Sequence, residues 1–185
     1  MEKQTFIALD FKTANYKRTS ICSVGMVKIV DNELMESFYT LVNPNDYFSQ
    51  NNIRVHGIRP KDVFNAPTFD VVFPHMLDFI DGHPVVCHNA AFDMGVLHQS
   101  IKALNLKTPD ITYFCSVQLA RKTLQMPRYG LSHVMKFFNL DFNGHHNALA
   151  DAKTCAMITY RLLRHYPSLD EVLLIYGESL QDKDY

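Results

Sequence analysis

The chain has 185 residues, of which 47% are hydrophobic, and its formal net charge is −1. This length and hydrophobic content suit one ordinary domain with a sizeable core, and they exclude a disordered chain. The balanced charge provides no global basic field, so a nucleic-acid partner would have to be held locally or through metal ions.

No apolar run reaches the ~18 residues that a membrane-spanning helix needs, and the N-terminus lacks a signal-peptide pattern. We therefore expect a cytoplasmic protein without a membrane partner. The four cysteines are spread widely through apolar segments, with no C-x-x-C pair. This spacing indicates reduced, buried thiols and argues against a zinc site.

The first third of the chain has the pattern of β-strands. An apolar run at residues 6–9 leads directly into Asp10, as expected of a strand that is buried on both faces. Residues 20–30 and 34–42 are rich in β-forming residues and are preceded by short polar turns, which predicts an antiparallel meander. A loop follows, in which apolar residues flank His56 and Gly57.

The remainder of the chain alternates between helical and strand patterns. We expect one α/β domain with a mixed five-stranded sheet, in which three antiparallel strands precede a β-α-β-α segment and helices flank the sheet. Residues 1–167 would form the domain, and residues 168–185 would form a C-terminal helix and tail packed on it or trailing it. The expected elements are a helix at 69–80 with Pro74 inside it, a strand at 84–88, a helix at 91–104, a strand at 111–115, and helices at about 116–124, 131–139, 148–164 and 169–180.

Polar side chains collect where the first strand ends. Asp10 and Lys12 follow the apolar run, and because side chains alternate along a strand, the two point to the same side. A buried strand that delivers polar groups to one end of a sheet is a common way to build an active site. The alternative is a solvated strand end without function.

Two further clusters lie at helix starts. Asn89 and Asp93 stand between a predicted strand and a helix, and strand ends are where sites collect in open α/β sheets. His146 and Asp151 lie about one helical turn apart at the start of the long helix over 148–164. The alternative interpretation of both clusters is helix capping and dipole compensation.

The three clusters together are more informative than each one alone. Asp10, Asp93 and Asp151 would repel one another strongly if they met, unless a cation joined them. Oxygen ligands of this kind suit Mg²⁺ or Mn²⁺, and such an ion acts on phosphate esters by polarising the phosphoryl oxygen and activating water. A neutral His146 at the rim could take the proton from that water.

The order LDFKT, VHGI, HNAAFD and HNALADA resembles that of the DnaQ-like DEDDh 3′→5′ exonucleases, most closely the DNA polymerase III epsilon-subunit type. The resemblance covers about residues 4–165. It implies an RNase H-like fold, 3′→5′ hydrolysis of single-stranded DNA or RNA ends with Mg²⁺ or Mn²⁺, and a polymerase or replication partner.

The resemblance also implies roles for individual residues. Asp10, Asp93 and Asp151 would bind metal, and His146 would be the general base. The remaining residues would bind or position the terminal nucleotide: Phe11, Lys12, Thr13, His56 and Asn89.

The first motif departs from the family pattern D-x-E, because Lys12 replaces the glutamate. Four carboxylates balance two divalent ions, whereas three carboxylates and one ammonium balance one. We therefore expect at most one tightly bound ion, with the Lys12 ammonium near the place of the other, and much reduced hydrolysis. The alternatives are a lysine that swings to solvent and a silent module that grips a 3′ end without cutting it.

Overall fold

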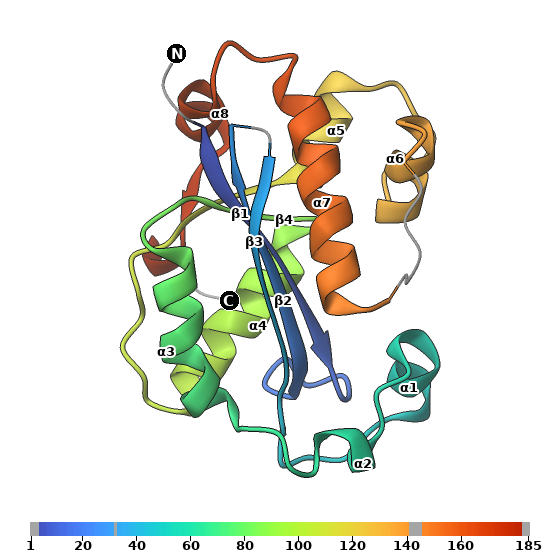
Figure 1. Ribbon diagram of the computed structural model, residues 1–185, viewed down its shortest axis with the longest axis vertical. Helices are drawn as coiled ribbons and strands as arrows, with labels where there is room; N and C mark the ends of the chain where they lie inside the picture. The colour runs from blue at the N-terminus through green and yellow to red at the C-terminus, as the bar shows by residue number, and fades with distance from the viewer. Residues whose placement is uncertain (1–3, 32, 141–145, 183–185) are drawn as a thin grey trace.

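The structure is a computed structural model that describes residues 4–31, 33–140 and 146–182. A mixed six-stranded sheet with the order β3-β2-β1-β4-β5-β6 lies between two layers of helices (Figure 1). This is the α/β architecture that the sequence predicts, with one short strand added at an edge.

The first three strands form the predicted antiparallel meander. They are β1 (Thr5–Thr13), β2 (Ile21–Val30) and β3 (Glu33–Leu41), and Asp10 of β1 pairs with Gly25 of β2. β4 (Val85–Cys87) and β5 (Thr112–Cys115) then extend the sheet in parallel with β1. β1 is therefore buried at the centre of the sheet, which explains its apolar run.

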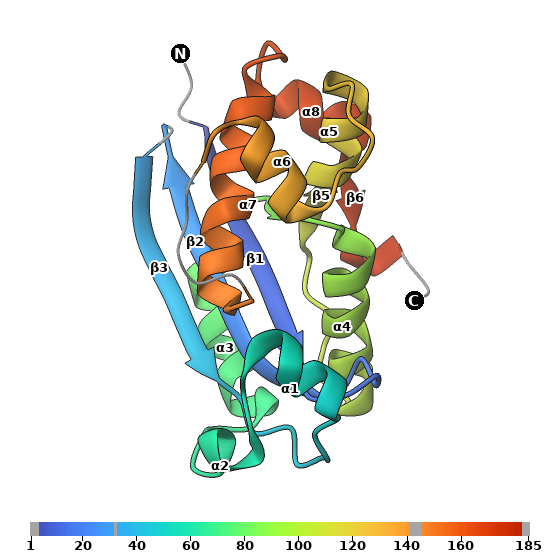
Figure 2. The same ribbon diagram turned by 90° about the vertical axis from the view of Figure 1, so that its right-hand side faces the viewer.

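Alternation along β1 separates the two faces of the sheet. Ile7, Leu9 and Phe11 enter a core shared with α3 (Phe69–Ile80) and α4 (Ala90–Ala103). Phe6 and Ala8 enter a second core on the opposite face. That second layer consists of α5 (Ser116–Thr123), α6 (Leu131–Phe137), α7 (Ala148–Leu163) and α8 (Leu169–Tyr176), as Figure 2 shows.

Two regions differ from the sequence-based expectation. The predicted loop around His56 contains two short helices, α1 (Gln50–His56) and α2 (Pro60–Val63). Ser49 caps α1 by accepting a hydrogen bond from the Asn52 amide, and Gly57 ends it with φ at 77°. No residue of α1 is buried, so the helix leaves no apolar periodicity in the sequence.

The final helix is also shorter than expected. α8 ends at Tyr176, and β6 (Glu178–Ser179) pairs antiparallel with β5 before a 3₁₀ turn at Leu180–Asp182. Within the described ranges, no helix has the length and apolar character needed to span a bilayer.

Candidate active site

A glycine in β2 allows two distant elements to meet at the end of β1. Gly25 pairs with Asp10, and a Cβ atom at Gly25 would overlap the backbone of Ala148 and Leu149. The first turn of α7 therefore rests directly on the sheet, and α7 places Asp151 over the face to which Asp10 and Lys12 point. The close approach of backbone to backbone is the reason that a glycine is needed here.

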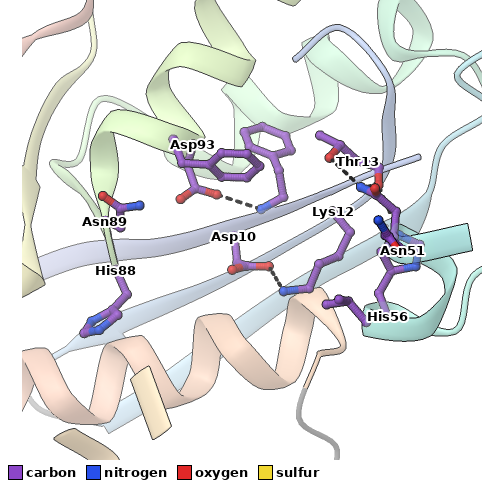
Figure 3. Close-up of a pocket in the computed structure, with 12 residues that line it drawn as sticks. Asp10, Lys12, Thr13, Asn51, His56, His88, Asn89 and Asp93 are labelled. Carbon is purple, nitrogen blue, oxygen red and sulfur yellow. Dashed lines mark hydrogen bonds and ion pairs between the residues drawn. The ribbon is translucent and has the colours of Figure 1, made fainter. Parts of the chain in front are cut away.

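Lys12 joins the two aspartates that this contact brings together. Its Nζ atom lies 2.6 Å from Asp151 Oδ2 and 2.9 Å from Asp10 Oδ2. The side chains of Lys12 and Asp151 are only 13% and 8% exposed. Burial acts to lower the pKa of Lys12, but Asp10 and Asp151 together raise it above its usual value. Lys12 is therefore an ammonium ion held inside the site, and Figure 3 shows its side chain extended toward Asp10.

The Asp10 carboxylate is held in an unfavourable environment. Burial raises its pKa to about 7, although Lys12 acts in the opposite direction. Its Oδ2 atom is buried, and among the described residues it has the Lys12 ion pair but no hydrogen bond of good geometry. An oxygen with an unused lone pair in such surroundings is suited to accept a cation.

Asp93 reaches the site from the first turn of α4 and is bonded to β1. It is 3% exposed, and its Oδ1 atom accepts a hydrogen bond of 2.9 Å from the Phe11 amide. Burial raises the pKa of Asp93 well above its usual range, and the negative charge of Asp10 adds to this effect. Asn89 precedes α4 in a left-handed conformation with φ at 77°, and its side chain makes no capping hydrogen bond. The capping role considered for Asn89 is therefore not the one it has.

His146 lies at the entry to α7 and is exposed. Its backbone is left-handed, with φ at 73°, and its amide donates a 3.4 Å hydrogen bond to Asp151 Oδ1. Asn147 caps α7 by accepting hydrogen bonds from the amides of Leu149 and Ala150. Asp151 is therefore bonded on both oxygens, once to its own loop and once to Lys12, and His146 stands outside this buried pair.

A cavity of about 350 Å³ opens beside these groups. One wall is formed by α1, whose residues the sequence patterns did not single out apart from His56. The cavity is lined by Asp10, Phe11, Lys12, Thr13, Asn51, Asn52, Val55, His56, His88, Asn89, Phe92 and Asp93. Six predicted residues of the first and second motifs thus share one cavity with His56, whereas His146 and Asp151 approach the site from α7.

The α1 wall is fastened to β1 through one carbonyl group. Asn52 Nδ2 donates to Thr13 O at 2.8 Å, and His56 Nε2 lies 3.1 Å from the same oxygen. His56 Nδ1 accepts a hydrogen bond from the Ile58 amide, so Nε2 carries the proton and donates to Thr13. Both ring nitrogens of His56 therefore hydrogen-bond to the backbone, one to Thr13 and one to Ile58. The sequence feature that could have revealed the helix carrying His56 is Ser49, a residue type that often caps a helix.

His88 is a second cavity residue that the sequence patterns did not single out. Its Nδ1 and Nε2 atoms lie 2.8 Å from Ser116 Oγ and 2.8 Å from Tyr129 O. The carbonyl can only accept, so Nε2 donates to Tyr129 and Nδ1 accepts from Ser116. Burial lowers the pKa of His88. This neutral histidine joins the end of β4 to α5 and to the segment before α6.

The carboxylate oxygens of the site suit a hard divalent cation, but the ammonium group of Lys12 lies between them. In the described part of the chain, no three His, Cys, Asp or Glu side chains stand together in a metal-binding arrangement. The Lys12 ammonium lies between Asp10 and Asp151 instead. A metal ion that bridged these two carboxylates would have to displace it.

Comparison with known sequences agrees with this geometry. Residues 7–159 match the RNase_T family model, described as "Exonuclease". The chain is 30% identical over 183 residues to a PolC-type DNA polymerase III of Thermotoga petrophila, covering 98% of this chain and 13% of the polymerase. It is 32% identical over 161 residues to the PolC-type polymerase of Caldanaerobacter subterraneus, covering 85% of this chain and 11% of the polymerase. The chain thus spans a small part of these relatives.

Solved structures share the fold. Exonuclease X in complex with 5′ overhanging duplex DNA superposes with a TM-score of 0.76 at 23% identity, covering 90% of this chain and 95% of that one. The nuclease domain of 3′hExo, a DEDDh family member bound to rAMP, gives a TM-score of 0.74 at 18% identity, with coverage of 88% and 92%. The RNase H-like fold implied by the motifs is therefore confirmed.

Proposed function

The chain belongs to the exonuclease family whose model it matches over residues 7–159, and from this premise we propose that it is a metal-dependent 3′→5′ exonuclease. Its substrate would be the 3′ end of single-stranded DNA or RNA. The observation that carries the proposal is the convergence of Asp10, Lys12 and Asp151 from β1 and α7 beside a cavity that also contains Asp93.

Exonucleases of this family depend on divalent metal ions. Here Asp10, Asp93 and Asp151 would hold Mg²⁺ or Mn²⁺, with at most one ion bound tightly because Lys12 already supplies one positive charge. When bound, the ion would polarise the phosphoryl oxygen and lower the pKa of water. Burial raises the pKa values of Asp10 and Asp93, and a cation bound beside these carboxylates would lower them.

The chain's own residues would do the remaining work. His146, exposed at the start of α7, would take the proton of the attacking water. Phe11, Thr13, His56 and Asn89 line the cavity that would receive the terminal nucleotide. The hydrogen bonds from Asn52 and His56 to Thr13 would keep the α1 wall fixed while the strand enters.

The relatives also bear on the partners and the process in which the reaction would take place. The relatives named above are PolC-type polymerases, and this supports a polymerase or replication partner and a role in DNA replication or repair. In such a role the protein would act in the cytoplasm.

The test is a nuclease assay on single-stranded DNA and RNA oligonucleotides labelled at the 5′ end, with Mg²⁺ or Mn²⁺. We expect a ladder that shortens from the 3′ end, slowly in the wild type and not at all in His146→Ala. A protein that binds the oligonucleotide but leaves it intact with either ion, and also after Lys12→Glu, would contradict the proposal. It would identify a silent module that binds 3′ ends.

A further inference from the structure

Positive charge is concentrated in one layer of the molecule. Residues 116–165 contain seven lysines and arginines but only two acidic residues, Asp141 and Asp151, so this segment carries +5 in a chain of net charge −1. The segment includes α5, α6 and α7, which cover the same face of the sheet (Figure 2). The balanced total charge therefore conceals a basic segment, although the acidic Asp170 and Glu171 of α8 lie in the same layer.

One basic cluster in this layer surrounds a cavity. Arg161, Arg164 and His165 line a cavity of about 360 Å³ together with Phe138, which follows α6. The three residues stand three and four positions apart, so they share one side of the C-terminal end of α7. Cations at a helix C-terminus also compensate the helix dipole, and this explanation is sufficient for the exposed Arg164.

Dipole compensation does not account for Arg161. Its Nε atom is buried, and it has no hydrogen-bond partner in the part of the chain that the structure describes. A buried guanidinium donor without an acceptor is costly, and such groups normally have a partner. Arginine donors match phosphate oxygens in both charge and geometry. The missing partner is therefore expected to be an anion from outside the chain.

We propose that Arg161, Arg164 and His165 form a second binding site, which takes a backbone phosphate of the same nucleic-acid strand whose 3′ end enters the active site. This inference rests on the proposed function. Arg161 lies ten residues after Asp151 on α7, which is about 15 Å along the helix axis. If the strand keeps the stacked geometry that it has in duplex DNA, with a rise of about 3.4 Å per nucleotide, this span corresponds to four or five nucleotides. The rigid helix would thus fix the distance between the two sites.

The experiment measures binding of 5′-fluorescein-labelled single strands of 4 and 20 nucleotides by anisotropy, in Ca²⁺ to limit hydrolysis, over a range of KCl concentrations. Arg161→Gln/Arg164→Gln should weaken binding of the 20-mer on the order of tenfold and lower its salt slope by about 0.7 units, the value for one single-strand phosphate contact. The ratio of variant to wild-type Kd should be much larger for the 20-mer than for the 4-mer. Inorganic phosphate at the same ionic strength should compete weakly.

Two further variants secure the result. Lys102→Gln/Lys107→Gln removes the same charge from exposed positions at and beyond the end of α4, on the opposite face, and should leave both slope and affinity unchanged. Arg164→Glu changes one exposed residue and should weaken 20-mer binding without affecting the fold. Equal slopes for the wild type and the α7 variants would overturn the second site and leave the exonuclease proposal standing. If the wild type bound neither strand, both proposals would fail.

Discussion

The two ends of α7 solve the problem of buried charge in opposite ways. At the first turn, Asp151 is 6% exposed and has an internal partner, because Lys12 from β1 lies 2.6 Å away. At the last turn, the buried Nε atom of Arg161 has no acceptor among the described residues. At the first turn, the chain itself supplies the counter-ion of Asp151. At the last turn, the charge of Arg161 is left for a partner outside the described residues to neutralise.

The difference shows what an internal ion pair does to a site. Buried carboxylates that lack a partner attract a cation, and a lysine that reaches them takes the place of that cation. Under the proposed function, Lys12 would weaken the binding of metal at the active site, because its ammonium already pairs with Asp10 and Asp151. No acceptor among the described residues bonds to the Nε atom of Arg161, so under our proposal the far end of α7 would still attract an anion.

The largest effect is expected from removing the internal cation. Lys12→Glu replaces the ammonium by a fourth carboxylate, so the site should bind metal more strongly and hydrolyse 3′ ends faster by orders of magnitude. Without metal the variant should be less stable than the wild type. Added Mg²⁺ or Mn²⁺ should raise its Tm far more than that of the wild type, because a ligand bound only by the folded state stabilises it.

Lys107→Glu is the matched control, since it makes the same charge change at an exposed position after α4. Its hydrolysis rate and its metal-dependent change in Tm should equal those of the wild type. Identical rates and identical metal responses for Lys12→Glu and the wild type would show that Lys12 does not act as a substitute cation. Differential scanning fluorimetry over a range of metal concentrations measures the response.

The next effect is the strength of the Lys12–Asp151 pair itself. A double-mutant cycle with Lys12→Met and Asp151→Asn should give a coupling energy of about 3 kcal/mol in the free energy of unfolding, because both partners are largely buried. The Lys17–Asp46 pair has a similar N–O distance of 2.9 Å, but Lys17 is 46% exposed. Its cycle, from Lys17→Met and Asp46→Asn, should give a much smaller coupling energy, because water screens an exposed pair.

Chemical denaturation at pH 7 without metal measures both cycles. Equal coupling energies for the two pairs would mean that burial does not strengthen the internal pair. The comparison between the two ends of α7 would then rest on geometry alone.

Sequence patterns predict those parts of the site that depend only on short stretches of the chain. An apolar run that changes abruptly to Asp10 marks a buried strand leaving the core, and Asn147 before Ala148 marks the start of α7, so strands, helices and three aspartates follow from short-range patterns. The family resemblance then joins those aspartates into one site. The six-stranded order confirms the expected meander and the parallel strands that follow it.

The remaining features depend on contacts between distant residues. Lys12 and Asp151 are separated by 139 positions, and no local pattern shows that an ammonium reaches the second aspartate. The Gly25 contact beneath α7 is equally remote. The α1 wall was missed for a different reason, because a seven-residue helix without a buried side chain has no periodic signal.

A third prediction concerns the pH dependence that Asp10 introduces. Burial raises its pKa from 3.8 to about 7, so between these values the folded protein binds the proton more tightly than the unfolded chain. The ionisation of Asp10 therefore costs stability, and this cost grows as the pH rises from about 4 to about 7. Asp10→Asn should be more stable than the wild type by about 4 kcal/mol at pH 8 without metal, because each pKa unit corresponds to about 1.4 kcal/mol.

The difference should shrink as the pH falls through about 7 and should level off only below about pH 3, where Asp10 is protonated in the folded and the unfolded state. Urea denaturation at pH 4, 6 and 8 measures it. A variant that is less stable than the wild type at pH 8 would mean that the Lys12 pair outweighs the cost of burying Asp10. The ionisation of Asp10 would then not be a net cost to the stability of the folded protein.

The smallest effect comes from the α1 wall, where two side chains donate to the same carbonyl and only one can titrate. His56→Ala and Asn52→Ala each remove one hydrogen bond to Thr13 and should each cost about 1 kcal/mol at pH 8. Burial lowers the pKa of His56 below its usual 6.5, so the stability that neutral His56 contributes is complete above pH 6.5 and is lost as the pH falls below it. The stability difference between His56→Ala and the wild type should therefore shrink from pH 7 to pH 5, whereas that of Asn52→Ala should stay constant. Parallel curves for the two variants would show that protonation of His56 costs nothing in the folded state, which the hydrogen bond that Nδ1 accepts from the Ile58 amide does not allow.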